Sequence, residues 1–208
     1  MDDQRQEKVG GPSQSVSSLR SDLSKTQTAV FAGGCFWCVE AVFSMLKGVK
    51  SVMPGYAGGK NRGPTSVGPT YEQVSNGDTG YAESLKIEFD PSVISYDDLL
   101  AVFFNTHDPT TLDRQGNDVG TQYRSAIFYS NEEQKHKAEM LIKELDDAKA
   151  YAKPIVTEVR PQSEFYEAEG YHRDFYKNNK GTPYCESVIE PKLEKLQKRF
   201  VRLMKPQV

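Results

Sequence analysis

The sequence predicts a single α+β domain, with a mixed sheet on a split β-α-β (ferredoxin-like) core and long functional loops. Strand and helix patterns alternate in the order β-α-β-β-α-β-α-β, which is typical of this fold class. Two long glycine-bearing stretches lack periodicity, and such stretches in a compact domain are usually functional. The length of 208 residues also suits one domain.

The N-terminal residues 1–26 are predicted to form a flexible tail in front of a folded domain at 27–208. The tail holds six serines and charges of both signs, so it buries too little apolar surface to offset the entropy lost on ordering. It also lacks the apolar core of a signal peptide, and the chain has no run of about 20 apolar residues. We therefore expect a cytoplasmic protein that does not enter membranes.

The first half of the domain predicts three strands and one helix. The first strand is a buried apolar run that ends at the glycine pair 33–34, and the third shows apolar–polar alternation. Between the second and third strands lies the first long loop, at 55–80, with seven glycines. The expected elements are a strand at 28–32, a helix at 36–46, and strands at 49–53 and 85–89.

The second half predicts the remaining helices and strands. A capping box at Ser95 and Asp98 starts a helix that ends near 105, and a second loop follows at 107–124. Asn131 caps a long charged helix. The C-terminal stretch has a net charge of +5, and apolar residues at helical spacing predict a docked helix with a solvated face. The later elements are expected at 125–129 (strand), 131–149 (helix), 155–159 (strand) and 192–205 (helix).

Charge and cysteine content narrow the function. The net charge of −3 argues against a nucleic-acid-binding protein. Three cysteines are too few for a secreted disulfide scaffold of this length, and Cys35 and Cys38 form a C-x-x-C pair with Cys185 far away. In an intracellular protein such a pair indicates redox or metal chemistry.

The surroundings of Cys35 favour a reactive thiol. A strand, two glycines and a helix start place it at a helix N-terminus, where free N–H groups and the helix dipole favour the thiolate. Cys38 lies on the same helix face, at a spacing that can close a disulfide. Three alternatives remain open: two plain core cysteines, a general dithiol–disulfide oxidoreductase, and a zinc-dependent interaction module. The zinc ligands would be Cys35, Cys38, Cys185 and one of His107, His136 or His172.

The chain resembles the A class of peptide methionine sulfoxide reductases. The stretch FAGGCFWCVE (31–40) is similar to the active-site signature of that family. Further similar blocks follow in order: PTYEQV (69–74), GYAE (80–83), HDPT (107–110), RQGNDVGTQYRS (114–125), FYEAEGYH (165–172) and PYC (183–185). The resemblance covers about 28–200, and it makes 27–208 the expected catalytic domain.

The resemblance implies a repair enzyme that reduces methionine-S-sulfoxide, free or in oxidised proteins. The Cys35 thiolate would attack the sulfoxide sulfur and become a sulfenic acid, which a second thiol converts to a disulfide. Thioredoxin or another dithiol would then reduce the disulfide, with no bound cofactor or metal. Glu83 would protonate the departing oxygen, which requires apolar surroundings that keep its carboxyl neutral.

The resemblance also implies the remaining site residues. Tyr71 and Tyr123, one in each long loop, would donate hydroxyl hydrogen bonds to the sulfoxide oxygen. Phe36 and Trp37 would form the apolar walls around the substrate methyl group, and Asp118 would order the pocket. His172 is expected to be a structural histidine near the site.

The sequence departs from common family patterns in three places. Cys38 stands where many members have glycine, Ser75 and Tyr81 stand where Cys and His are frequent, and the loop at 60–68 is longer than usual. The resolving thiol is therefore ambiguous. Cys185 lies in the stretch from which many members draw their recycling thiol, so we expect direct resolution by Cys185 or a relay through Cys38 and Cys185.

Overall fold

The computed structural model describes residues 26–59 and 68–206. The predicted tail and the long loop at 60–68 therefore lie outside the described residues, except for residues 26 and 68.

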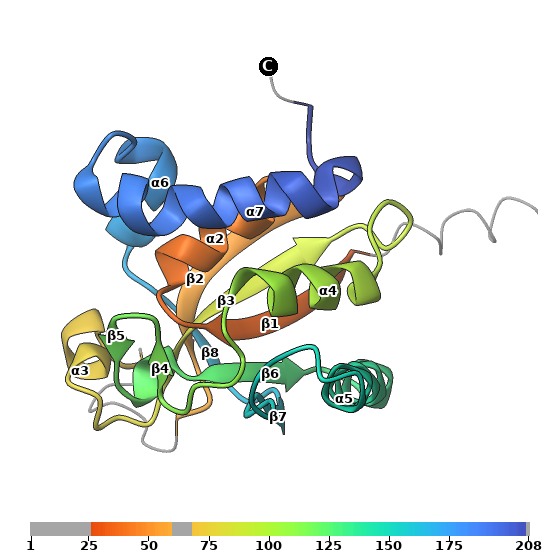
Figure 1. Cartoon of the computed structure of the whole chain (residues 1–208). Helices are drawn as coiled ribbons and strands as arrows, with labels where there is room; N and C mark the ends of the chain where they lie inside the picture. Colours follow the sequence, from red (N-terminus) through yellow and green to blue (C-terminus); the bar gives the residue numbers. More distant parts are fainter. Residues whose placement is uncertain (1–25, 60–67, 207–208) are drawn as a thin grey trace, which may run out of the picture.

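A six-stranded mixed sheet forms the centre of the domain (Figure 1). Its strand order is β7-β6-β1-β3-β2-β8, and only the β6–β7 pair at one edge is parallel. A small hairpin lies apart from it, made of β4 (Arg114–Gln115) and β5 (Asp118–Val119). The strands of the main sheet are β1 (Gln27–Gly33), β2 (Val49–Ala57), β3 (Ala82–Phe89), β6 (Ser125–Tyr129), β7 (Glu158–Pro161) and β8 (Phe165–Glu167).

Two interleaved β-α-β units explain the centre of the sheet. Helix α2 (Phe36–Ser44) connects β1 to β2, and β3 lies between these two strands. Helix α4 (Tyr96–Thr106) connects β3 to β6, and β1 lies between those two. This interleaving is the split β-α-β arrangement that the sequence predicts. Helix α5 (Glu132–Asp147) then connects the parallel pair β6 and β7.

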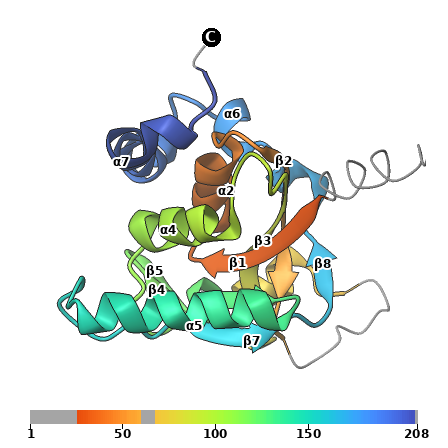
Figure 2. The same ribbon diagram turned by 90° about the vertical axis from the view of Figure 1, so that its right-hand side faces the viewer.

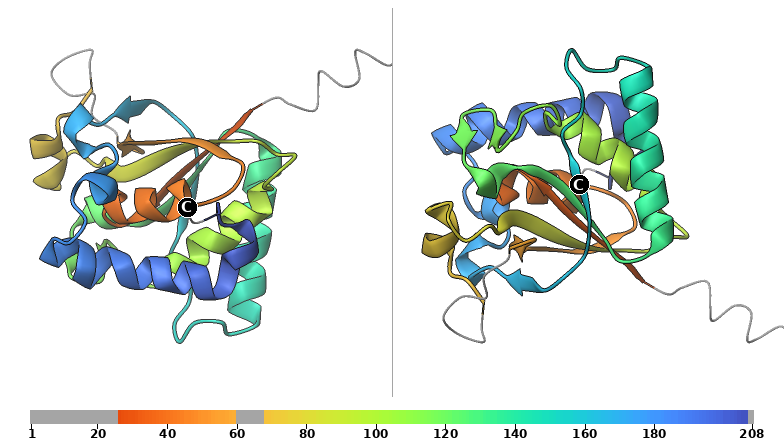
Figure 3. Two further views of the ribbon diagram at one scale, coloured as in Figure 1. Left: turned by 90° about the horizontal axis from the view of Figure 1, so that it is seen from above. Right: turned by 90° about the horizontal axis from the view of Figure 1, so that it is seen from below.

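The long helices cover one face of the sheet (Figure 2). On that face the strands contribute large side chains, such as Phe31, Leu85 and Ile127, which pack against α2, α4 and the C-terminal helix α7 (Glu190–Phe200). Seen from above, α7 lies alongside α2 (Figure 3). The opposite face is lined by smaller residues, among them Ala32 and Ala126. Residues of one strand alternate between the faces, so the sequence of each strand decides what the helices meet.

Most predicted elements are confirmed, but several boundaries are wrong. The last predicted strand lies three residues later, at β7, and the last helix begins at Glu190 rather than 192. The first long loop contains the short helix α3 (Tyr71–Ser75), and the second contains the β4–β5 hairpin and a 3-10 turn, η1 (Thr121–Tyr123). The sequence also gave no indication of β8, of the 3-10 turn η2 (Gly170–His172), of α6 (Phe175–Asn178), or of the π-helical turn η3 (Cys185–Ile189).

Across the described part of the chain, the helices are too short or too polar to cross a membrane.

Candidate active site

Cys35 lies between β1 and α2, at the N-terminal end of the helix. It is the N-cap residue of α2, and its carbonyl accepts hydrogen bonds from the N–H groups of Cys38 and Val39. Gly34 makes this tight junction possible, because its φ of 91° is rarely adopted by other residues. A Cβ atom at Gly34 would also lie 2.5 Å from Cγ of Gln115. The turn therefore presents the thiol of Cys35, which is 8% exposed, at the end of the helix.

Glu83 places a buried carboxyl beside this thiol. It is the second residue of β3, is 2% exposed, and accepts the Phe36 N–H at 3.0 Å through Oε2. Because Phe36 directly follows Cys35, this bond holds the carboxyl at the start of α2. Burial raises the pKa of Glu83 to about 8, although the hydrogen bond from Phe36 opposes the rise. At neutral pH the carboxyl is therefore mainly protonated and can donate a proton.

The thiols of Cys35 and Cys38 form a coupled pair. The hydrogen bond between them raises the pKa of Cys35 well above its ordinary value, and burial adds to this rise. The same hydrogen bond lowers the pKa of Cys38 to about 7, against the effect of burial. The sequence predicted the thiolate at Cys35, whereas the hydrogen bond favours the first negative charge at Cys38. The two thiols therefore titrate as a pair, in which Cys38 loses its proton more readily than Cys35.

Tyr71 and Tyr123 bring two phenols to the same place. Tyr71 begins α3, and its ring lies 6.3 Å from that of Phe36. Tyr123 ends η1 and packs against the cluster that contains Cys35. Burial is the main cause that raises the pKa of both phenols, and the charge of the nearby Glu83 is the second. Both phenols therefore remain hydrogen-bond donors. Asp118 on β5 is close enough to Glu83 that its charge raises the pKa of that carboxyl further.

Aromatic rings form the wall beside the thiols. Phe36 is 1% exposed, and its ring lies 6.2 Å from that of Trp37. Trp37 stacks on Phe175 of α6 at 3.8 Å, with an angle of 8° between the planes. Its indole N–H donates to Nδ1 of His172 at 3.1 Å. His172 is buried, and the centre of its ring lies 4.9 Å from that of the Phe36 ring. It therefore packs against both aromatic residues of the wall.

Cys185, from the C-terminal part of the chain, belongs to the same apolar cluster as the other two cysteines. All three cysteines are free and buried. Cys185 begins η3, directly before α7, and π-helical turns often occur at functional sites. Its neighbour Tyr184 places its hydroxyl 3.5 Å from Sγ of Cys38. The structure therefore brings all nine residues predicted for the site close together.

The sequence did not reveal three residues that hold this arrangement together. Glu40 is 5% exposed and accepts the N–H groups of Asp174 and Phe175, at 2.8 and 3.2 Å. Glu169 accepts the Tyr71 N–H and the hydroxyl of Tyr56, each at 2.9 Å. The third is Tyr184. All three residues lie inside the recognised blocks, but only tertiary contacts show what they bind.

The structure gives the zinc alternative no support. No cluster of three or more His, Cys, Asp or Glu side chains suited to a metal ion occurs within 26–59 and 68–206. Both ring nitrogens of His107 are used, since they lie 2.7 Å from the Phe103 carbonyl and 2.8 Å from the Ser125 hydroxyl. His136 is exposed on α5.

A cysteine at a helix start, a protonated carboxyl beside it and a wall of aromatic rings define a thiol-based oxidoreductase. Comparison with known proteins agrees with this class. A family model described as peptide methionine sulfoxide reductase matches residues 27–203. The chain belongs to this family, and its relatives place it in the A class, as the sequence motifs predicted.

Two relatives and two solved structures illustrate the similarity. "Peptide methionine sulfoxide reductase MsrA" of Sulfolobus acidocaldarius is 55% identical, over 84% of this chain and 95% of its own length. The protein of the same name from Thermus thermophilus is 52% identical, over 86% and 98%. Reduced Mxr1 from Saccharomyces cerevisiae matches with a TM-score of 0.71 and 31% identity, over 77% of this chain and 90% of that chain. Methionine sulfoxide reductase A of Corynebacterium diphtheriae has a TM-score of 0.64 and 32% identity, over 74% and 75%.

Proposed function

We propose that this protein reduces methionine-S-sulfoxide, free or within oxidised proteins, with Cys35 as nucleophile and Glu83 as acid. The observation that carries this assignment is the hydrogen bond from the Phe36 N–H to Glu83, which holds a neutral carboxyl next to Cys35. Reduction of a sulfoxide needs both groups at one point, because the oxygen must take up a proton as the thiolate attacks the sulfur.

The first step transfers the oxygen from the substrate to Cys35. The proton of the Cys35 thiol passes to Cys38, and the Cys35 thiolate attacks the sulfoxide sulfur. Glu83 gives its proton to the sulfoxide oxygen while the hydroxyls of Tyr71 and Tyr123 donate hydrogen bonds to it. The attack forms a bond between the two sulfurs. The protonated oxygen then leaves the methionine sulfur and bonds to the Cys35 sulfur, while the sulfur–sulfur bond breaks and methionine leaves with its electron pair. Cys35 is then a sulfenic acid.

Phe36 and Trp37 bind the methyl group of the substrate. Their rings supply apolar area and sulfur–aromatic contacts next to the thiol. Asp118 orders the pocket through its position beside Glu83. The sulfoxide side chain of the substrate is uncharged, so its recognition depends on shape and on the phenol hydroxyls.

The second step is a relay through both remaining thiols. Cys38 attacks the sulfenic acid first, because it already shares a hydrogen bond with Cys35, and water leaves as the disulfide forms. Cys185 then attacks Cys38 and moves the disulfide to the C-terminal segment. Thioredoxin reduces this disulfide, and the enzyme uses no bound cofactor. We assign this chemistry to the cytoplasm, where thioredoxin keeps thiols reduced.

The direct test uses the separated S and R epimers of a methionine sulfoxide peptide, with thioredoxin as reductant. We expect turnover of the S epimer only, and no turnover by Cys35→Ser. Retained activity in Cys35→Ser would refute the assignment, and insulin reduction without sulfoxide reduction would favour a general dithiol oxidoreductase.

The order of the thiols is tested by mass mapping of the disulfides after one turnover. Cys185→Ser should accumulate the Cys35–Cys38 disulfide and turn over slowly with thioredoxin. Full thioredoxin-dependent turnover by Cys185→Ser would show that Cys38 is sufficient, and a Cys35–Cys185 disulfide in Cys38→Ser at the wild-type rate would show direct resolution.

A further inference from the structure

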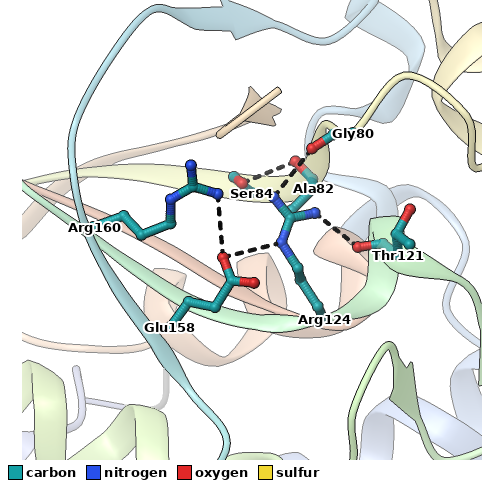
Figure 4. Close-up of polar contacts among 7 residues, drawn as sticks. All are labelled: Gly80, Ala82, Ser84, Thr121, Arg124, Glu158 and Arg160. Atoms are coloured by element: carbon teal, nitrogen blue, oxygen red, sulfur yellow. Dashed lines mark hydrogen bonds and ion pairs between the residues drawn. The ribbon is translucent and has the colours of Figure 1, made fainter. Parts of the chain in front are cut away.

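On the face of the sheet opposite the helices, Arg124 connects two segments that lead to the candidate active site (Figure 4). It directly follows Tyr123 and is 6% exposed. Its Nη1 donates to the carbonyl of Thr121 at 2.8 Å, and its Nη2 donates to the carbonyl of Gly80 at 3.1 Å. One planar guanidinium therefore joins the turn that carries Tyr123 to the loop that enters β3.

Strand geometry explains why this contact bears on Glu83. Side chains alternate along β3, so Glu83 faces the helices while Ala82 and Ser84 face the side on which Arg124 lies. Gly80 precedes this strand by two residues, and its position helps to set where β3 begins. A shift of Gly80 relative to Thr121 would change the distance between the Glu83 carboxyl and the phenol of Tyr123.

The guanidinium is fixed in place by its surroundings. Its Nε lies 3.5 Å from Oε2 of Glu158, on the edge strand β7. Gly58, with a φ of 76°, leaves room for it, because a Cβ atom there would lie 3.0 Å from Nη2 and 2.6 Å from the Phe128 ring. Arg160 on the same edge strand also reaches Glu158, at 3.4 Å. Arg124 and Arg160 thus share Glu158 as a partner, whereas the bonds to the Thr121 and Gly80 carbonyls come from Arg124.

Two further bonds connect the same segments. The Thr121 hydroxyl donates to the Gly77 carbonyl at 2.9 Å, and the Gln122 amide donates to the Ser75 carbonyl at 3.0 Å. Loss of Arg124 should therefore weaken the contact between the Thr121 turn and the loop before β3 without separating them. The expected defect is in the placement of groups, which catalysis detects more sensitively than folding does.

We propose that Arg124 is a positioning residue, which sets the distance between Glu83 and Tyr123 by joining Gly80 to Thr121 from the opposite face of the sheet. The inference rests on the roles proposed above for Glu83 and Tyr123. Lysine cannot replace arginine here, because an ammonium group lacks the planar fork that reaches two carbonyls and a carboxylate together.

The test compares Arg124→Lys and Arg124→Ala with the control Arg160→Ala, in single turnovers of a methionine-S-sulfoxide peptide without a recycling reductant. Each variant is measured below its melting temperature, across the pH range around the Glu83 pKa of about 8. Both Arg124 variants should lower the maximal rate of sulfoxide reduction by about 10-fold or more. The peptide concentration at half of that rate should stay unchanged, because the Phe36–Trp37 wall is not altered. Their pH midpoint should move below that of the wild type, since a displaced carboxyl regains water. Arg160→Ala should keep the wild-type rate and midpoint.

Three results would overturn the proposal. The first is a folded Arg124→Lys with the wild-type rate and pH midpoint. The second is an Arg124→Ala that melts earlier but keeps both values per folded molecule, which indicates a structural role only. The third is an equal loss in Arg160→Ala. Glu83→Gln distinguishes a failure of the proposed function from a failure of the Arg124 inference. If this variant reduces sulfoxide at the wild-type rate, Glu83 is not the acid and the Arg124 inference fails as well. If only Glu83→Gln is slow, Arg124 alone was misassigned.

Discussion

Two regions supply the candidate site, and they are built differently. The first region consists of β1, α2 and β3 and supplies Cys35 and Glu83. Its two strands pair with each other in the middle of the sheet. The second region, residues 165–190, supplies Cys185 through elements that are three to five residues long. Single side chains such as Glu40 hold this second region against the first.

The difference matches what each region is proposed to do. The nucleophile and the acid must be held in one geometry, because the rate of sulfoxide reduction depends on how the two groups are placed relative to the substrate. The recycling thiol must instead meet Cys38 and then a reductase, which requires movement. Segments with few regular contacts open at low free-energy cost, so the second region suits the mobile step.

The largest effect is expected from Glu83→Gln in the first region. Glutamine keeps the shape and can accept the Phe36 N–H, but it cannot supply the proton. We expect the rate of sulfoxide reduction to fall by about 10²–10⁴-fold, measured in single turnovers. The matched control is Glu88→Gln on the exposed side of the same strand, which should react at the wild-type rate. A fall of less than about tenfold would mean that Glu83 is not the acid.

A smaller effect is expected from Glu40→Ala, which breaks the link between the regions. The change leaves the N–H groups of Asp174 and Phe175 without their acceptor and should lower the free energy of unfolding by about 1–3 kcal/mol. Trp37 is the only tryptophan and stacks on Phe175, so its fluorescence reports directly on the link.

Glutamine at position 40 provides the comparison for that experiment. Glu40→Gln retains one oxygen as an acceptor, so its stability and its Trp37 spectrum should lie between those of the wild type and Glu40→Ala. An Ala variant with unchanged fluorescence would show that the second region stays in place without Glu40.

The same contrast explains how much of the fold could be predicted. Helix α4 has a local signal in Ser95 and Asp98, whose side chains make a complete capping box. Helix α3 has an equally complete box at Thr70 and Gln73, but its glycine-rich surroundings hid it. The edge strand β7 was misplaced because its position depends on its pairing with β6, which periodicity does not contain.

The site shows the same division: residues in local sequence motifs were predicted, and contacts that depend on tertiary structure were not. Motifs identified Cys35 and Glu83, which lie in continuous blocks of sequence. They did not show that the thiols of Cys35 and Cys38 share a hydrogen bond, because that depends on the distance between two side chains. Helix α6 begins after Asp174, whose φ is 53°, and Glu40 from another helix completes its N-terminus. Contacts of this kind have no local signature.

The smallest effect concerns the pH dependence of stability in the first region. Burial raises the folded-state pKa of Glu83 from 4.5 to about 8, so between these values the folded protein binds a proton that the unfolded chain has released. The stabilisation is therefore complete below pH 4.5 and is lost as the pH rises through about 8. As the pH rises from 6 to 7, the loss of the Glu83 contribution should lower the free energy of unfolding by about 1 kcal/mol. This is close to the limit of about 1.36 kcal/mol per pH unit for one proton. Denaturant titrations of wild type and Glu83→Gln at these two values measure the difference, with Glu88→Gln as the control that keeps the wild-type slope. Equal slopes in all three proteins would mean that Glu83 is ionised in the folded state, and the first region would then hold a charge beside Cys35 instead of an acid.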